Sequence, residues 1–317
     1  MANPGLLAVK TINLIEEMIR ADQGAAYRGH LGKIIPEMKD AYRSEPETFR
    51  SHLGASLVGT KCARAIWYGF HWATKSDFSG RILRLFNRGH LEEARFIAML
   101  QTIGVHVVQA DENGNQYRIS GANGHYGGSG DGVAFGIPDL SPGMWALLEF
   151  KTHNDASFKK LKEDGVRSAK FEHYVQMQQY MKKMGLGASL YMAVNKNTDE
   201  LYGEIIPLDT PVADQFIDRG EKIVWLKRAP EKLGNPPSPG NFDCKWCDHR
   251  PICFLGATPP VNCRTCSYAT PLDTGNGEWG CTNPMFQVSA FSNSPMVLEK
   301  SVQLTGCAHW AKHPDIG

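Results

Sequence analysis

Hydrophobic and polar positions in the first third of the chain follow a helical period. Apolar residues three and four apart predict helices over 5–20, 56–68 and 80–103, and the last has the longest regular repeat. The more polar stretch 24–52 is predicted to be helical with a break near Pro36, because proline ends or bends a helix. The N-terminal part is therefore expected to be largely helical.

The period changes at Val105 to the short apolar runs that are typical of strands. Asn, Gly and Asp turns separate these runs, which lie at 105–108, 116–120, 130–137 and 145–151. Two helices, two strands and a closing helix are predicted next, at 155–164, 170–184, 188–195, 201–207 and 209–228. This order of elements predicts an α/β fold whose mixed central sheet is flanked by helices.

The composition changes abruptly after Pro230. The segment 234–240 is rich in proline and glycine, which is typical of a linker, and few periodic apolar segments follow it. Seven of the eight cysteines lie beyond this segment, so we expect metals to replace a hydrophobic core there. We predict an N-terminal helical region (1–55), a central domain (56–255) and a small metal-bound C-terminal module (256–317).

Charge and length exclude some classes of function. The 317 residues have a formal net charge of +1, with 21% charged and 42% hydrophobic residues, which disfavours a histone-like polyanion binder. No apolar run approaches the ~20 residues of a membrane span, and the N-terminus lacks a cleavable signal pattern. We therefore expect no membrane partner and a cytoplasmic location, in a bacterium or in a phage-infected host cell.

The candidate chemistry centres on 130–151. Asp131 lies between two glycines before one apolar segment, and Glu149-Phe150-Lys151 closes the next. Side chains alternate along a strand, so Glu149 and Lys151 share a face while Phe150 points into the core. Two carboxylates and a lysine that converge in this way are suited to hold a divalent metal and to activate water against a phosphodiester. A plain hairpin would account for the glycines equally well.

Two predicted helices carry polar pairs on one face. His90 and Glu93 are three residues apart, and Gln176 and Tyr180 are four apart. The first pair is compatible with a solvated acidic edge. It is also compatible with a helix face that turns toward the two carboxylates and completes a metal site.

In their order and spacing, these motifs resemble the PD-(D/E)XK nuclease superfamily and, within it, the RecB-type exonucleases. The resemblance covers roughly 56–255, and each motif is short and degenerate. The literal Pro-Asp pair is absent because Gly130 precedes the acid, a form common among RecB-type members. The resemblance implies a restriction-endonuclease-like core and a metal-dependent deoxyribonuclease. The motifs are Gly89/His90/Glu93, Asp131, Glu149-Phe150-Lys151 and Gln176 to Tyr180.

The resemblance also implies a metal site. Asp131, Glu149 and the Phe150 carbonyl would bind Mg²⁺ or Mn²⁺, together with either His90 or Glu93. The ion would polarise the scissile phosphate and lower the pKa of bound water.

Further roles follow for the other motif residues. Lys151 would orient or deprotonate the water and stabilise developing charge. Gln176 and Tyr180 would position the DNA strand or the lysine. Contacts to phosphates are expected from Arg64, Lys159 and Lys170, although a solvated surface is the default for such lysines.

The first group of cysteines has three members close in sequence. In a cytosolic chain, two-residue gaps favour metal binding over disulfides. Cys244-x2-Cys247-x5-Cys253 supplies three ligands where a cluster or a tetrahedral zinc needs four, and Cys62 is the candidate fourth. This pattern resembles the iron–sulfur centre of the CRISPR adaptation nucleases and of certain bacterial helicase-nuclease subunits. The resemblance implies a [4Fe–4S] cluster, with Zn²⁺ as the alternative.

The second group of cysteines is similar to a zinc ribbon. Cys263-x2-Cys266, followed by Cys281 and Cys307, offers four thiolates to Zn²⁺. His309 could substitute for Cys307, since only one residue separates them. A structural role is favoured, with DNA or protein contact as the alternative.

Three functions are compatible with these motifs. The leading one is an exonuclease of phage or bacterial type that digests linear duplex or single-stranded DNA. It would serve end resection, recombination or repair, and a recombination or single-strand annealing protein is an expected partner. The second is a CRISPR-adaptation-like nuclease that trims DNA. The third is a non-catalytic iron–sulfur or zinc protein serving electron transfer, DNA binding or scaffolding. The complete motif series disfavours the third, because an electron carrier has no need of it.

Overall fold

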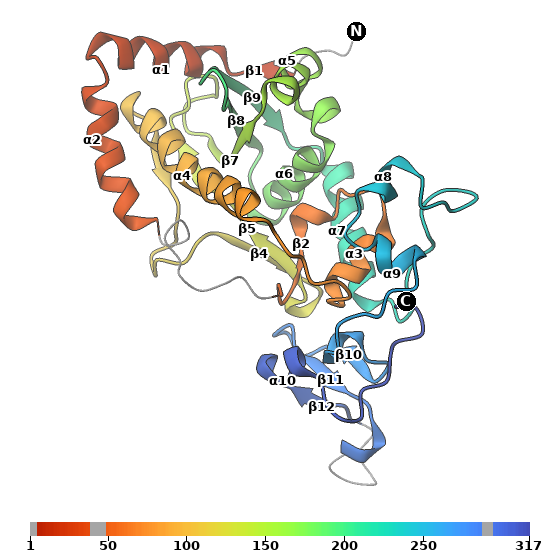
Figure 1. The fold of residues 1–317 in the computed structure, drawn as a ribbon. Coiled ribbons are helices and arrows are strands. Elements are labelled where there is room, and N and C mark those ends of the chain that lie inside the picture. The colour runs from red at the N-terminus through yellow and green to blue at the C-terminus, as the bar shows by residue number, and fades with distance from the viewer. Residues whose placement is uncertain (1–4, 39–48, 287–293) are drawn as a thin grey trace. The chain divides into compact units, whose positions relative to one another are not determined.

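The computed structural model describes residues 5–38, 49–286 and 294–317. As predicted, the chain is a mixed α/β protein with a mixed central sheet flanked by helices (Figure 1). It divides into two compact units, each built from separate stretches of chain. Among the described residues, unit 1 comprises 5–38, 78–119 and 129–214, and unit 2 comprises 49–77, 120–128, 215–286 and 294–317. The predicted domain boundaries after residues 55 and 255 stay predictions.

The central sheet of unit 1 has the strand order β1-β9-β8-β7-β6-β3. β7 and β8 run parallel, and the other neighbours are antiparallel. Two helices, α5 and α6, connect the parallel pair, as a crossover between parallel strands requires. The strands are β1 (Leu6–Leu7), β3 (His106–Val108), β6 (Val133–Phe135), β7 (Trp145–His153), β8 (Ala188–Asn195) and β9 (Leu201–Pro207).

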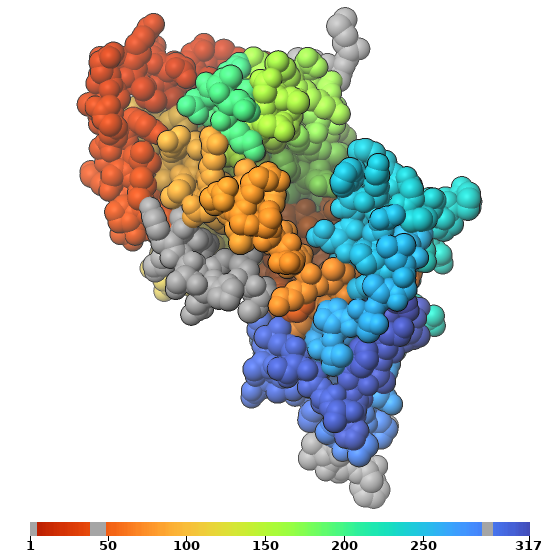
Figure 2. Space-filling model, in the orientation of Figure 1, coloured from red at the N-terminus to blue at the C-terminus, as the bar shows by residue number. Residues whose placement is uncertain are grey.

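Helices cover both faces of this sheet. On one face, Phe96 of α4 stacks on Phe150 of β7 with ring centroids 4.9 Å apart, and Ile15 of α1 belongs to the same core. On the other face, α5 and α6 pack against β7 and β8. The first half of α4, orange in Figure 2, lies on the surface, where Leu83 and Phe86 are exposed. The helices are α1 (Val9–Ala21), α2 (Ala25–Ile34), α4 (Gly80–Thr102), α5 (Asp155–Ala169) and α6 (Phe171–Met184).

The core of unit 2 is rich in aromatic rings. Trp67, Trp72 and Trp279 are fully buried, and the buried Arg264 guanidinium lies 3.9 Å from the ring centre of Trp72 and 4.6 Å from that of Trp279. Three-stranded sheets form in the orders β2-β5-β4 and β10-β11-β12. The elements that lie wholly in unit 2 are β2 (Leu53–Gly54), α3 (Ala63–Phe70), α8 (Phe242–Lys245), α9 (Arg250–Phe254), β10 (Ala269–Pro271), β11 (Trp279–Cys281), β12 (Met296–Leu298) and α10 (Lys300–Thr305). Three further elements begin or end in stretches of unit 1: β4 (Arg118–Gly121), β5 (Tyr126–Ser129) and α7 (Thr210–Trp225).

Four predicted elements differ from the structure. The helix predicted over 155–164 continues to Ala169. The helix predicted over 5–20 begins at Val9, because Leu6 and Leu7 pair with β9 instead. The helix predicted over 56–68 begins only at Ala63, because Cys62 has an extended backbone and caps it. The strand predicted over 130–137 shortens to β6, since Gly132 has φ +138°.

The prediction for 24–52 is tested only in part. α2 and a 3-10 turn (Ile35–Glu37) around Pro36 agree with a helix and a break, while 39–48 lie outside the described residues. Among the helices that the structure describes, none is both long and apolar enough to cross a membrane.

Candidate active site and cysteine centres

Asp131 lies in the turn before β6, opposite Glu149 of β7. Val133 pairs with Leu147 in antiparallel register, and extending this register by two residues sets Asp131 beside Glu149. The Asp131 Oδ2 atom also accepts a hydrogen bond of 2.7 Å from the Phe150 backbone N–H. Pairing between the two strands therefore brings the two predicted carboxylates together.

Gly132 shapes the turn that holds Asp131. Its φ of +138° is rare for residues with side chains, and a Cβ there would lie 2.9 Å from the Val108 carbonyl oxygen of β3. On the other side of Asp131, a Cβ on Gly130 would lie 3.3 Å from Leu147 Cδ1. The glycines thus allow a close backbone approach.

Glu149 is the buried centre of this site, with 1% of its surface exposed. Lys151 Nζ donates to Glu149 Oε1 and, at 3.1 Å, to the Phe150 carbonyl oxygen. Gln176 Nε2 donates to Glu149 Oε2 at 3.1 Å. Both carboxylate oxygens therefore have partners from the predicted motifs.

Burial and charge change the titration of this group of residues. Burial raises the pKa of Glu149 to about 7; Lys151 opposes this rise and Asp131 adds to it. Burial acts to lower the pKa of Lys151, but Glu149 and Asp131 hold it above its ordinary value. Lys151 is therefore a cation at neutral pH.

The helix α4 contributes Glu93 to the surroundings of Lys151. The charge of Glu93 also raises the pKa of Lys151. Phe96, three residues further along α4, stacks on Phe150 and holds this helix against β7. His90 Nδ1 lies 3.8 Å from Glu93 Oε1, and both side chains are partly exposed. Of the two helical candidates, Glu93 is the one that acts electrostatically on Lys151, with His90 beside it.

Tyr180 connects α6 to the turn that carries Asp131. Its hydroxyl donates to the Ser129 carbonyl oxygen at 3.0 Å, two residues before Asp131. Gln176, four residues earlier, faces the same site through Glu149. The pair predicted to share a helix face therefore contacts the acid-bearing turn and strand.

Sequence reasoning missed a polar group beside Lys151. The Tyr191 hydroxyl of β8 lies 2.9 Å from His153 Nε2 and 3.1 Å from His173 Nδ1. Burial, reinforced by the Lys151 charge, lowers the pKa of His153 to about 4 and that of His173 to about 3. The alternation of side chains along β7 could have predicted His153, because it shares a face with Lys151. No local sequence pattern connects Tyr191 with either histidine.

The chemistry of the donor atoms fits a hard divalent cation. The carboxylates of Asp131 and Glu149 and the Phe150 carbonyl provide oxygen atoms, the ligands that Mg²⁺ and Mn²⁺ prefer. Across the part of the chain that the structure describes, no three or more His, Cys, Asp or Glu side chains form a group that could hold a metal ion as they stand. Metal ligation by these residues stays a prediction.

The three predicted phosphate contacts differ in their surroundings. Arg64 of unit 2 donates to the Tyr68 hydroxyl at 2.9 Å and to the Pro230 carbonyl oxygen at 2.8 Å, which are structural contacts. The exposed Lys159 forms an ion pair of 2.9 Å with its helix neighbour Asp155. Lys170 donates to the Ser157 hydroxyl at 2.5 Å. Their contacts with DNA stay predictions.

The first cysteine group comes together in unit 2. Cys62 precedes α3, Cys244 lies on α8 and Cys253 on α9, and with Cys247 they line one cavity. Burial raises the pKa of the thiols of Cys244, Cys247 and Cys253. Four thiols on one cavity fit a [4Fe–4S] cluster or a Zn²⁺ ion.

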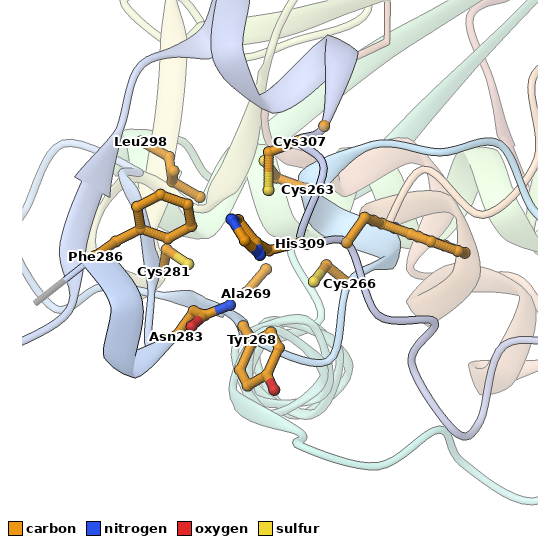
Figure 3. Close-up of a pocket in the computed structure, with 12 residues that line it drawn as sticks. Cys263, Cys266, Tyr268, Ala269, Cys281, Asn283, Phe286, Leu298, Cys307 and His309 are labelled. Carbon is orange, nitrogen blue, oxygen red and sulfur yellow. The ribbon is translucent and has the colours of Figure 1, made fainter.

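The second cysteine group lines another cavity of unit 2 (Figure 3). The sulfur atoms of Cys263, Cys266, Cys281 and Cys307 turn toward a common space, and the His309 ring faces the same space (Figure 3). Four thiols and an imidazole fit a zinc site in their chemistry.

Comparisons with known proteins find several similar solved structures, three of which are described below. No family model matches the chain, and no curated protein matches it. The alkaline exonuclease LHK-Exo from Laribacter hongkongensis has a TM-score of 0.39 at 16% identity, covering 55% of this chain and 86% of its own. Its complex with dAMP has a TM-score of 0.38 at 16% identity with the same coverage. The protein SSO0001 has a TM-score of 0.37 at 15% identity, covering 72% of this chain and 97% of its own.

Proposed function

We propose that this protein is a metal-dependent deoxyribonuclease that digests linear DNA from its ends. The observation that supports this most is the convergence of Asp131, in the turn before β6, with Glu149 and Lys151 on β7. Gln176 and Glu93 reach the same place from two helices. Oxygen ligands beside a lysine are what metal-assisted phosphodiester hydrolysis requires.

The chain's own residues would hold and serve the metal. A bound Mg²⁺ or Mn²⁺ would polarise the scissile phosphate and lower the pKa of a bound water. Asp131, Glu149, the Phe150 carbonyl and Glu93, with His90 as the alternative to Glu93, would supply its ligands. Because Lys151 donates to Glu149 Oε1, its ammonium competes with a metal for that oxygen.

Lys151 would act as a cation rather than as a base. Glu149 and Asp131 hold its pKa above the ordinary value, so it keeps its proton at neutral pH. Once displaced from Glu149, the ammonium can donate hydrogen bonds to the attacking water and to the phosphate oxygens on which charge develops. While Lys151 makes these contacts, Gln176 would hold the Glu149 carboxylate in its orientation.

The biological setting belongs to the same proposal. The resemblance of the motifs to RecB-type exonucleases supports end resection in recombination or repair, with a strand-annealing protein as partner. The cavity lined by Cys62, Cys244, Cys247 and Cys253 supports a [4Fe–4S] cluster, with Zn²⁺ as the alternative.

Digestion of end-labelled linear DNA beside closed circular DNA tests the activity. We expect Mg²⁺- or Mn²⁺-dependent loss of the linear DNA and persistence of the circle. Lys151→Ala should lower the rate by about 100-fold or more, since it removes a charge aimed at the transition state. Lys222→Ala, which removes an exposed lysine of α7, is the control and should keep the wild-type rate. Equal rates for wild type and Lys151→Ala would contradict the proposed site, and equal loss of circle and line would contradict exonuclease action.

A further inference from the structure

We propose that the C-terminal part of unit 2 binds one structural Zn²⁺ through Cys263, Cys266, Cys281 and Cys307. All four thiols line a single cavity, although they come from three separate stretches of the chain (Figure 3). A tetrahedral zinc takes four such ligands. This inference is independent of the proposed nuclease activity.

The first pair of ligands lies on a turn that the surrounding structure already orders. Cys263 begins a 3-10 helix (Cys263–Thr265), and Cys266 follows it. The Asn262 side chain accepts a hydrogen bond of 3.1 Å from the Thr265 N–H, and the Thr265 hydroxyl accepts one of 3.3 Å from the Asn262 N–H. Reciprocal bonds of this kind fix the start of a helix. The two cysteines are thus held at the spacing that a zinc ribbon uses.

Arg264, between these cysteines, anchors the turn in the core of unit 2. Its guanidinium donates to the Gln303 side chain at 2.9 Å and to the Phe70 carbonyl oxygen at 3.2 Å. Its position over the Trp72 and Trp279 rings adds cation–π contacts. Because the arginine side chain is fixed inward, the cysteines on either side of it are presented to the cavity.

The chain end packs back onto the same turn. The Ala311 N–H donates to Cys266 Sγ at 3.4 Å. Trp310 Nε1 donates to the Thr265 hydroxyl at 3.2 Å. Cys307 lies three residues before Trp310, so these two bonds hold it close to the first pair.

The remaining ligands come from two further elements. Cys281 ends β11, whose Trp279 is fully buried. Cys307 follows α10 and turns its sulfur toward the space that the other three cysteines share (Figure 3). His309 packs edge-on against the Phe286 ring, with centroids 5.5 Å apart. We therefore assign Cys307 as the fourth ligand and His309 to the cavity wall.

Zinc binding would replace protons on these sulfur atoms. Burial raises the pKa of Cys263 to about 11 and also raises that of Cys281, so both are neutral thiols at pH 7 without a metal. Four thiols bind one Zn²⁺ and release four protons, which leaves a tetrathiolate centre of net charge −2. The ion would join β11, the 263–266 turn and the segment after α10, so its role is structural.

Metal analysis of the full chain, purified without oxygen, tests the assignment. We expect the zinc content to fall by one equivalent in Cys266→Ser and in Cys307→Ser and to stay at the wild-type level in His309→Ala. Ser267→Ala, at the exposed position next to Cys266, is the matched control and should keep the wild-type zinc content. A zinc content in Cys266→Ser equal to that of the wild type would overturn the site. Loss in His309→Ala with retention in Cys307→Ser would overturn the assigned ligands.

Alkylation of the wild-type thiols tests the same site without relying on a variant that folds. Cys307 is exposed, and a free exposed thiol reacts readily with iodoacetamide. If zinc holds it, mass spectrometry should show Cys307 alkylated at least tenfold more slowly before treatment with a zinc chelator than after it. The same rate before and after would overturn the proposal. Because this measurement does not involve DNA, its outcome does not depend on whether the nuclease proposal is correct.

Discussion

At the scale of single residues, Tyr191 joins two histidines beside the candidate catalytic lysine. Its hydroxyl lies within hydrogen-bond distance of His153 on β7 and of His173 on α6. Tyr191 also pairs in register with Glu149. The hydroxyl therefore couples the helix that carries Gln176 to the strand that carries Glu149 and Lys151.

Tyr191→Phe should change both stability and cleavage. Loss of the hydroxyl removes a hydrogen-bond partner from the buried His153 and the half-buried His173, so the free energy of unfolding should fall by about 1–2 kcal/mol. The DNA cleavage rate should fall by about tenfold, because Gln176 and Glu149 are no longer held in register. Denaturant titration and the linear-DNA assay measure the two effects.

Tyr202→Phe is the matched control for this change. Tyr202 lies on β9, which β8 separates from β7, and donates to Glu204 Oε2 at 2.6 Å. It should lose similar stability and keep its cleavage rate. If the two variants cleave DNA equally well, Tyr191 has no positioning role.

At the scale of elements, the packing of α4 on β7 decides whether a helical ligand can reach the site. Phe96 and Phe150 are nearly coplanar, with 12° between the ring planes, and both are buried. Phe150 points away from the face that carries Glu149 and Lys151, so the same strand supports the core on one side and the site on the other.

Phe96→Ala should therefore affect both folding and activity. A cavity at this position should cost about 3–5 kcal/mol of unfolding free energy. Cleavage should also fall, because α4 carries Glu93. Phe86→Ala, on the exposed half of the same helix, should stay within about 0.5 kcal/mol of wild type. Thermal melting and the cleavage assay compare the two, and an unchanged cleavage rate in a folded Phe96→Ala protein would show that α4 is dispensable.

At the scale of the whole molecule, buried histidines make stability depend on pH. His71 in unit 2 is 5% exposed, stacks on Trp67 with ring centres 3.7 Å apart and lies near His313. Burial lowers the pKa of His71 to about 3. The folded form therefore stays neutral at pH values where the unfolded form, with a pKa of about 6.5, takes up a proton.

Acid should consequently unfold the wild type more readily than a His71→Gln variant. Stability that is present above pH 6.5 is lost as the pH falls toward 3, by up to about 1.4 kcal/mol per pH unit from this one residue. Denaturant titrations between pH 7 and 4 should give a flatter pH dependence for His71→Gln. His106→Gln, at an exposed position of β3, should retain the wild-type slope. Parallel slopes for all three proteins would contradict this account.

The sequence by itself determined the order and type of most elements of unit 1. α4 and α6 and the strands β7 to β9 lie where periodicity predicts them, because the 3.6-residue and two-residue periods are local properties of the chain. Alternation likewise set Glu149 and Lys151 on one face and Phe150 on the other. The boundaries of α3 and β6 were not predictable, since one depends on the backbone of Cys62 and the other on that of Gly132.

Only the tertiary structure decided which distant residues meet. The pairing of β6 with β7 sets Asp131 opposite Glu149, and the parallel pairing of β7 with β8 brings Tyr191 beside them. The packing of α4 on β7 brings Glu93 within electrostatic reach of Lys151. Strand register and helix packing depend on contacts between residues far apart in the chain, and no local period encodes them.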